Sequence, residues 1–155
     1  MTIRKAVGAD LDGVSACLAE AFAPYRDRYT PAAFSDTVLT IEAARRRLEQ
    51  MTILVAGDRE SIVGTIGYEA RPDGEGHLRG MAVLRSAQGS GLAAQLLAAA
   101  ETGLLEGGCT RVTLDTTRPL ERARAFYERH GYTPTGVIRD FYGMELIEYA
   151  KMLGR

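Results

Sequence analysis

Two glycines and a serine stand directly in front of an alanine- and leucine-rich run in the stretch VLRSAQGSGLAAQLLAAAE, Val83–Glu101. Glycine lets a backbone approach a ligand without a Cβ clash. The run that follows is typical of a helix. Free N–H groups at a helix N-terminus form a phosphate site, and the helix dipole favours the negative charge. The chemistry predicted for this stretch is therefore binding of a phosphate or pyrophosphate.

Two familiar phosphate-binding patterns fit this stretch poorly. A P-loop needs Gly-Lys-[Ser/Thr], whereas Gly91 is followed by Leu92. Gly89–Ala94 does match the dinucleotide pattern G-x-G-x-x-A, and Asp115 follows roughly 20 residues on, where a ribose-binding acid belongs. That pattern requires the strand to run straight into the first glycine, however, and Leu84–Gln88 intervene. A nucleotide-binding oxidoreductase fragment is kept as an alternative, although the chain has too few strand–helix units for a doubly wound sheet.

The elements that must position the glycine stretch follow from periodicity and turn residues. We expect strands over 2–6, 52–58, 61–70, 77–84, 110–117, 133–140 and 144–153, and helices over 11–23, 40–51, 92–106 and 118–132. Stretches 24–37 and 71–76 predict loops. This order predicts a mixed α/β sheet in a single domain, residues 1–155.

Composition excludes several classes of function. The chain has 155 residues, of which 46% are hydrophobic and 25% charged, and its net charge is -1. These values are ordinary for a globular domain and do not indicate binding to nucleic acid or to an anionic membrane. The sequence has neither a signal peptide's apolar core nor a membrane-length apolar run. Cys17 and Cys109 lack metal-ligand spacing and favour reduced thiols over a disulfide, so we expect a cytoplasmic protein without a metal.

Three segments together resemble the GNAT superfamily of N-acetyltransferases. Gln88-x-x-Gly91-x-Ala93 is similar to its Arg/Gln-x-x-Gly-x-Gly/Ala signature. Ala123–Tyr132 looks like its Ala-x-x-Φ-Tyr-x-x-x-Gly-Phe/Tyr segment, and the closing stretch 142–153 is similar to its last strand. The resemblance covers 76–153 well and the first half only by element order. It implies a GNAT-like fold of the α+β type, with a mixed central sheet of about seven strands and helices on both faces.

The resemblance implies transfer of the acetyl group of acetyl-CoA to a primary amine by direct attack in a ternary complex. The amine would belong to a small molecule, an amino acid or a protein. A non-catalytic coenzyme A-binding sensor or scaffold is the alternative. The fourth strand, the glycine loop and the following helices would bind the coenzyme through these residues: Met81, Ala82, Val83, Gln88, Gly89, Ser90, Gly91, Leu92, Ala93, Leu120 and Tyr127. The backbone N–H near Val83 is the candidate oxyanion donor, while Leu120 stands where the family often has an asparagine that contacts pantetheine.

Two residues are candidates for proton transfer under this resemblance. Tyr127 would protonate the leaving thiolate, because its reference pKa of about 10 is a fair match for a thiol of about 8.5. His77 stands where many members have a glutamate, and a neutral imidazole can accept a proton near pH 7. Strand alternation places Arg79 on the same face as His77, where it would lower the imidazole's proton affinity. Glu69 or Glu75 acting through water, or a water chain alone, are equal alternatives for the base.

The acceptor amine is expected between the loop after the first helix and the closing hairpin. Aromatic residues in these segments are the candidate acceptor contacts: Tyr25, Tyr29, Phe141 and Tyr142. Arg26 and Arg28 either favour a carboxylate on the acceptor or are solvated loop charges. Because members of the superfamily are often dimers, the resemblance is also compatible with a homodimer.

Overall fold

Seven strands form one sheet in the computed structural model, which describes residues 2–58 and 60–154. The strand order is β1-β2-β3-β4-β5-β7-β6, and the neighbours are antiparallel except for the parallel pair β4 and β5. The strands are β1 (Ile3–Lys5), β2 (Thr52–Asp58), β3 (Ser61–Arg71), β4 (Glu75–Val83), β5 (Arg111–Thr117), β6 (Thr133–Phe141) and β7 (Met144–Met152). This sheet confirms the mixed seven-stranded architecture expected from the sequence.

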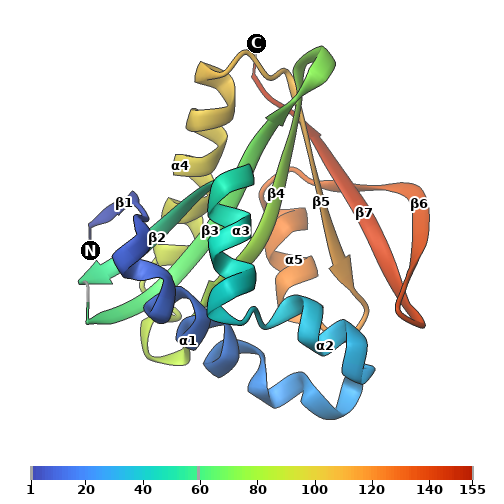
Figure 1. Cartoon of the computed structure of the whole chain (residues 1–155). Coiled ribbons are helices and arrows are strands. Elements are labelled where there is room, and N and C mark those ends of the chain that lie inside the picture. The colour runs from blue at the N-terminus through green and yellow to red at the C-terminus, as the bar shows by residue number, and fades with distance from the viewer. Residues whose placement is uncertain (1, 59, 155) are drawn as a thin grey trace.

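Helices cover both faces of the sheet (Figure 1). In that view α1 and α3 lie in front of the sheet, and α4 and α5 lie behind it. The helices are α1 (Leu11–Phe22), α2 (Pro31–Thr37), α3 (Ile41–Gln50), α4 (Leu92–Glu106) and α5 (Glu121–Arg129). None of the helices in the described part of the chain is long and apolar enough to cross a membrane.

A separate hydrophobic core lies on each face of the sheet, and alternate side chains of β2 belong to one core or the other. Leu54 and Ala56 pack with α4 and α5, whereas Ile53 and Val55 pack with α1 and α3. Successive side chains of a strand point to opposite faces, so a strand covered on both sides is apolar throughout. On α4 the buried residues recur at helical spacing: Leu92, Leu96, Ala100 and Leu104. The two cysteines are free and lie in opposite cores, as the reduced-thiol prediction requires.

The expected loop over 24–37 is wrong. Ala23–Arg28 forms a short 3-10 helix, and Pro31–Thr37 forms α2. Thr30 caps α2 by accepting a hydrogen bond from the Ala33 N–H at 3.2 Å, and Pro31 occupies the first turn, where its missing N–H costs nothing. The expected helix over 118–132 is also shorter, because α5 begins only at Glu121 and Pro119 precedes it.

The parallel pair β4 and β5 separates partway along its length. The two strands are paired from Glu75↔Arg111 to Leu78↔Leu114, and beyond these residues no pairing joins them in the described structure. Figure 1 shows them diverging toward the lower end of the molecule, with α5 behind the gap. The N-terminal half of β4 is therefore held between two strands, and its C-terminal half, after Leu78, keeps only β3 as a neighbour.

A β-bulge bends β4 at the point of separation. Thr65 of β3 pairs with Ala82 and Gly67 pairs with Arg79, so Gly80 and Met81 together oppose Ile66. Gly80 has a φ of +67°, which is the left-handed conformation that a bulge of this kind places on glycine. The bulge redirects β4 away from β5 just where the gap opens.

We predict that Gly80→Ala lowers the free energy of unfolding by about 1–2 kcal/mol, because an L-residue with a Cβ is strained in the left-handed region. Gly8→Ala is the matched control, since a Cβ at Gly8 would meet nothing within 4 Å and Gly8 has no positive φ. Urea unfolding of both variants measures the difference. Equal stability of the two variants would contradict the role assigned to Gly80.

Candidate active site

The glycine stretch lines a cavity of about 470 Å³, here named the loop cavity. Its wall is formed by the end of β4, the loop before α4, the first turn of α4, one side of α5, and the end of α1 with the residues that follow it. The predicted coenzyme residues that line it are Met81, Ala82, Val83, Gln88, Gly89, Gly91, Leu92, Ala93 and Tyr127. Two predicted residues do not: Leu120 lines a different cavity, and the Ser90 hydroxyl donates to the Ala87 carbonyl.

The loop cavity contains backbone donors suited to an anion. Gly91 is the N-cap of α4, and the first N–H groups of a helix have no partner within it. Within the described residues, the N–H groups of Gly89, Ser90 and Gly91 donate to no other group either. Gly89 and Gly91 have φ values of +82° and +85°, and a Cβ on either would meet nothing within 4 Å. The loop is thus an open cradle of backbone N–H groups, an arrangement that suits a phosphate.

The exposed edge of β4 borders the same cavity. The Leu84 N–H donates to Val63 of β3 at 2.8 Å, so Leu84 directs its backbone toward β3. Alternate residues of a strand direct their backbone groups to opposite sides. The backbone of Val83 therefore points into the gap left by β5, where its carbonyl accepts a hydrogen bond from Gln88 Nε2 at 3.3 Å. The Val83 N–H faces this gap.

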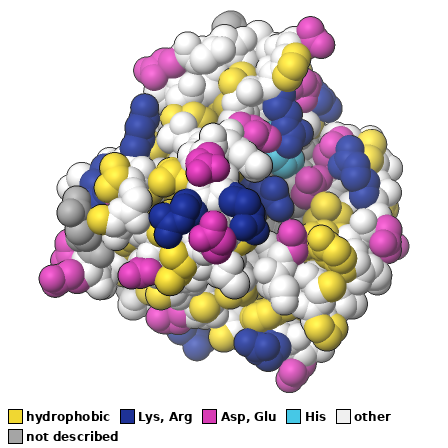
Figure 2. Space-filling model, in the orientation of Figure 1, with side chains coloured by type: hydrophobic (Ala, Val, Ile, Leu, Met, Phe, Trp, Pro, Cys, Tyr) yellow, Lys and Arg dark blue, Asp and Glu magenta, His cyan; other side chains and the backbone are white. Residues whose placement is uncertain are grey.

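A second cavity, of about 310 Å³, lies in the gap between β4 and β5 and is here named the strand cavity. Helices α1, α2, α3 and α5, the end of β3 and the β6–β7 hairpin complete its wall. Figure 2 shows basic and acidic side chains gathered around a hollow on the face where α3 lies in front of the sheet. Four residues line both cavities, which therefore meet at them: Phe22, Met81, Ala123 and Tyr127.

Tyr127 lies at this junction. Its ring is buried, and its hydroxyl donates to Met81 Sδ at 3.4 Å. Burial raises the pKa of Tyr127, so the hydroxyl keeps its proton at neutral pH. An uncharged proton donor therefore stands where the two cavities join.

His77 lines the strand cavity, near the last paired residues of β4. Its Nδ1 lies 2.9 Å from the Thr113 hydroxyl, and its Nε2 lies 3.7 Å from Asp115 Oδ2. Burial, together with the charges of Arg71 and Arg79, lowers the pKa of His77 to about 4, so the imidazole is neutral at pH 7. Burial also raises the pKa of Asp115. The sequence indicated the part played by Arg79, but not that Asp115 faces His77.

The predicted acceptor aromatics fall into three groups. Tyr29 and Phe141 line the strand cavity, and the Tyr29 hydroxyl is 2.6 Å from the Thr117 hydroxyl. Tyr25 lines the loop cavity instead. Tyr142 lines neither cavity: its side chain is 55% exposed, and it lies in the β6–β7 turn. Leu120, which was predicted to contact the coenzyme, lines the strand cavity as well.

Sequence reasoning placed Arg79 beside His77 but missed the other charged residues that line the strand cavity with it: Asp36, Arg47, Arg71 and Asp115. These residues come from α2, α3, β3 and β5, and no spacing along the chain relates them. One sequence signal could have indicated that Arg47 is buried: it follows Ala44 at helical spacing on the inner face of α3. In residues 2–58 and 60–154, no group of three or more His, Cys, Asp or Glu side chains is arranged to hold a metal ion.

The lowered pKa of His77 predicts a pH-dependent stability. The unfolded chain binds a proton at His77 near pH 6.5, and the folded chain only near pH 4. Stability that is present above pH 6.5 is therefore lost as the pH falls toward 4, with about 2 kcal/mol lost between pH 7.5 and 5. Urea unfolding across this range should show a shallower decline for His77→Gln than for the unaltered protein. Parallel declines would contradict burial of a neutral imidazole.

Comparisons with known proteins agree with this geometry. The model of the acetyltransferase (GNAT) family matches residues 17–132. Among curated proteins, none matches the chain significantly. The fold is similar to solved N-acetyltransferases. The PaiA N-acetyltransferase of Thermoplasma acidophilum in complex with coenzyme A has a TM-score of 0.81 and 17% identity, with 97% of this chain and 98% of that one covered.

Two further solved structures cover nearly the whole chain. The ribosomal-protein-alanine N-acetyltransferase of Brucella melitensis has a TM-score of 0.76 and 22% identity over 99% of this chain and 100% of that one. An N-acetyltransferase of Staphylococcus aureus has a TM-score of 0.76 and 20% identity over 99% of this chain and 98% of that one. These likenesses show the fold, and the family model spans most of the sequence. The chain therefore belongs to the acetyltransferase (GNAT) family.

Proposed function

We propose that this chain transfers the acetyl group of acetyl-CoA to a primary amine by direct attack in a ternary complex. The observation that supports this most strongly is the meeting of two cavities at Tyr127 and Met81. One cavity has a cradle of backbone N–H groups, and the other has a neutral imidazole. Two reactants bound on either side of this junction would meet there, and holding them together removes much of the entropic cost of reaction.

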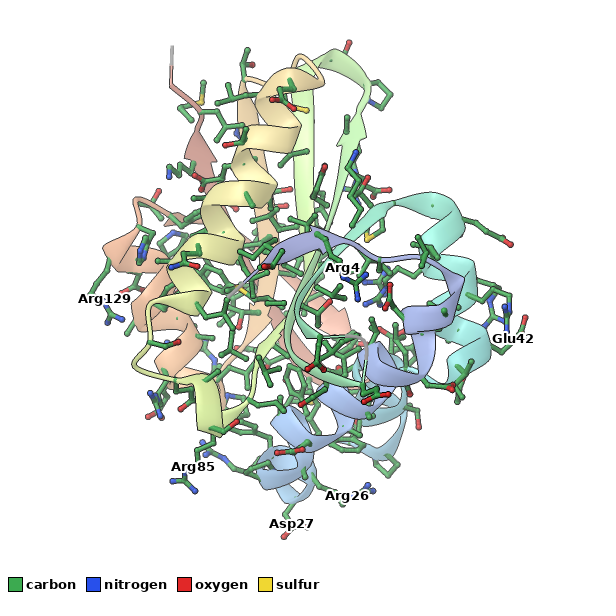
Figure 3. The ribbon with its side chains drawn as sticks, turned by 90° about the vertical axis from the view of Figure 1, so that its left-hand side faces the viewer. Arg4, Arg26, Asp27, Glu42, Arg85 and Arg129 are labelled. Carbon is green, nitrogen blue, oxygen red and sulfur yellow. The ribbon has the colours of Figure 1, made fainter. Side chains whose placement is uncertain are left out.

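The loop cavity would hold the coenzyme. Its pyrophosphate would accept hydrogen bonds from the loop N–H groups at the start of α4. Arg122 and Arg129 of α5 also line the cavity and would attract further phosphate charge. Figure 3 shows Arg129 and Arg85 projecting outward on the side where the loop and α5 lie. Gln88 would contribute through its bond to Val83, which fixes the loop against β4.

The edge of β4 would hold the pantetheine arm and the thioester. An extended arm can pair with an open strand edge in the manner of an added strand. Met81, Ala82 and Val83 supply that edge, and their side chains pack against the cores on either face. The Val83 N–H, which faces the gap, would donate to the thioester oxygen as it gains negative charge.

Tyr127 would protonate the leaving thiolate. The burial that raises the pKa of this tyrosine would also raise the pKa of a thiol placed beside it, so the two groups stay matched. Leu120, near the start of α5, would offer an apolar surface to the acetyl group or to the acceptor rather than the polar contact often found in the family.

His77 would accept the proton that the amine loses. The other acids weighed for this role are engaged elsewhere: Glu75 pairs with Arg111 at 2.9 Å and Glu69 with Arg71 at 2.9 Å. His77 is neutral at pH 7 and so has one bare ring nitrogen. Its low pKa means that it would pass the proton on rather than keep it, and Asp115 is the neighbouring acceptor.

Acetyl-CoA at 100 times its dissociation constant should raise the free energy of unfolding by about 2.7 kcal/mol.

Gly91→Val should weaken acetyl-CoA binding at least tenfold, because the added carbons occupy the open space of the cradle. Gly136→Val is the matched control: Gly136 also has a positive φ and open surroundings, but lies on β6. Thermal unfolding with acetyl-CoA, and with a nicotinamide dinucleotide for comparison, measures both. Equal affinities in the two variants would mean that the loop is not the cradle.

Tyr127→Phe should lower turnover about 100-fold, which is within the usual range for loss of a general acid. Acetyl-CoA affinity should stay within a few-fold, since only the hydroxyl is removed. Steady-state release of coenzyme A and a binding titration measure the two quantities. Unchanged turnover would refute the acid role, and tight binding without turnover of any amine by the unaltered protein would favour the sensor or scaffold alternative.

A further inference from the structure

The strand cavity contains a buried guanidinium whose charge no neighbour neutralises. Arg47 of α3 lines this cavity and is 9% exposed. Among residues 2–58 and 60–154, none accepts a hydrogen bond from Arg47 or forms an ion pair with it within 4 Å. The other two arginines of the cavity are paired, Arg79 with Asp36 at 3.3 Å and Arg71 with Glu69 at 2.9 Å.

The Arg47 guanidinium faces the cavity rather than being sealed in protein. Its nitrogens are not among the buried side-chain atoms that lack both solvent and a partner. The negative charge of Asp36 acts on the guanidinium without forming an ion pair with it, and the like charge of Arg79 has the larger, opposite effect on the pKa of Arg47. The donors of Arg47 are therefore presented to whatever enters the strand cavity.

Folding alone does not account for an arginine at this position. Burial of an unpaired charge is costly, and burial is the main reason that the pKa of Arg47 falls to about 10. The same helix places Arg45 and Arg46 in solvent, and Figure 3 shows Glu42 projecting away from the protein. The inner face of α3 would be stable with an apolar side chain, so we look to a ligand for the counter-charge.

Arg47 lies close to the proposed point of reaction. A Cβ built on Gly80 would be 2.6 Å from Arg47 Nη1, so the guanidinium rests on the bulge of β4. The next residue, Met81, is in contact with the Tyr127 hydroxyl. Consecutive Cα atoms are about 3.8 Å apart. An anion on Arg47 would therefore lie within a short molecule's length of an amine at the cavity junction.

We propose that the acceptor is a small amino acid-like molecule whose carboxylate binds Arg47 while its primary amine reaches the junction at Met81 and Tyr127. This rests on the proposed acetyl transfer. The planar guanidinium fork suits a carboxylate, which it can bind through two parallel hydrogen bonds. A singly charged group also fits better than a phosphate dianion, because Asp36 and Asp115 share the cavity. The volume of about 310 Å³ is that of a small-molecule site.

The first experiment compares amino acids with their carboxamides as acceptors. We expect the best acceptor to have a kcat/KM at least tenfold higher as the free acid than as the amide. In Arg47→Met this preference should fall toward unity, mainly through KM. Arg46→Met, an exposed arginine on the same helix, is the matched control and should keep it. Equal use of acids and amides by the unaltered protein would overturn the carboxylate site while leaving acetyl transfer intact.

A second measurement detects carboxylate binding at Arg47 without relying on turnover. Amino acids of the same panel should raise the melting temperature of the unaltered protein and of Arg46→Met, but not that of Arg47→Met. Without ligand, Arg47→Met should melt at the same temperature or higher, because it removes an unpaired buried charge. A melting temperature lowered by this substitution would make Arg47 structural and overturn the proposal. Amino acid binding through Arg47 with no acetylation of any amine would support the carboxylate site and refute acetyl transfer.

Discussion

Strands β4 and β5 pair only where Glu75–Leu78 of β4 lie beside Arg111–Leu114 of β5. Their separation beyond these residues determines where the other parts of the site lie. A strand that loses its neighbour exposes N–H and C=O groups, which need partners from another source. Gln88 satisfies one of these, the Val83 carbonyl, and the N–H groups on that edge remain directed into the gap. The bulge at Gly80 and the cover of α5 behind the gap stabilise an opening that a regular parallel sheet would close.

The opening has two ends with different electrostatics. At the α4 end, backbone N–H groups and arginines of α5 give a positive, hydrogen-bonding surface without a buried side-chain charge. At the α3 end, paired and unpaired charged side chains surround His77 and Arg47. Tyr127 separates the two ends and is uncharged. A nucleotide-containing acetyl donor on one side and a small charged acceptor on the other would each find complementary groups, with an uncharged proton donor between them.

The order of strands and helices could be predicted because both cores depend on simple periodicity, as in β2, whose alternate residues pack on opposite faces. The glycine cradle could also be predicted, because its positive φ values demand glycine and its helix follows at once. The site residues as a set stay predictions, although most of them line one of the two cavities. The Thr30–Pro31 start of α2 was missed because proline and aromatic residues in that stretch also suit a loop.

The charged half of the site could not be predicted, because tertiary contacts create it. Asp115 faces His77 only because β4 and β5 are adjacent and parallel, and Asp36 reaches Arg79 only because α2 folds back over the sheet. Gly80, by contrast, carried a readable signal: an isolated glycine inside a strand pattern often marks a bulge. Read that way, the sequence would have located the bend in β4, though not the arginine that rests on it.

Backbone hydrogen exchange with and without saturating acetyl-CoA is the most direct test of this site, because the groups proposed to bind the coenzyme are backbone N–H groups rather than side chains. Exchange should slow at Val83 and at Gly89–Gly91, the edge of β4 and the cradle, while the amides of β6 at the far edge of the sheet are unchanged. Acetyl-CoA that binds without slowing exchange at Val83 and Gly89–Gly91 would mean that these N–H groups do not hold the coenzyme.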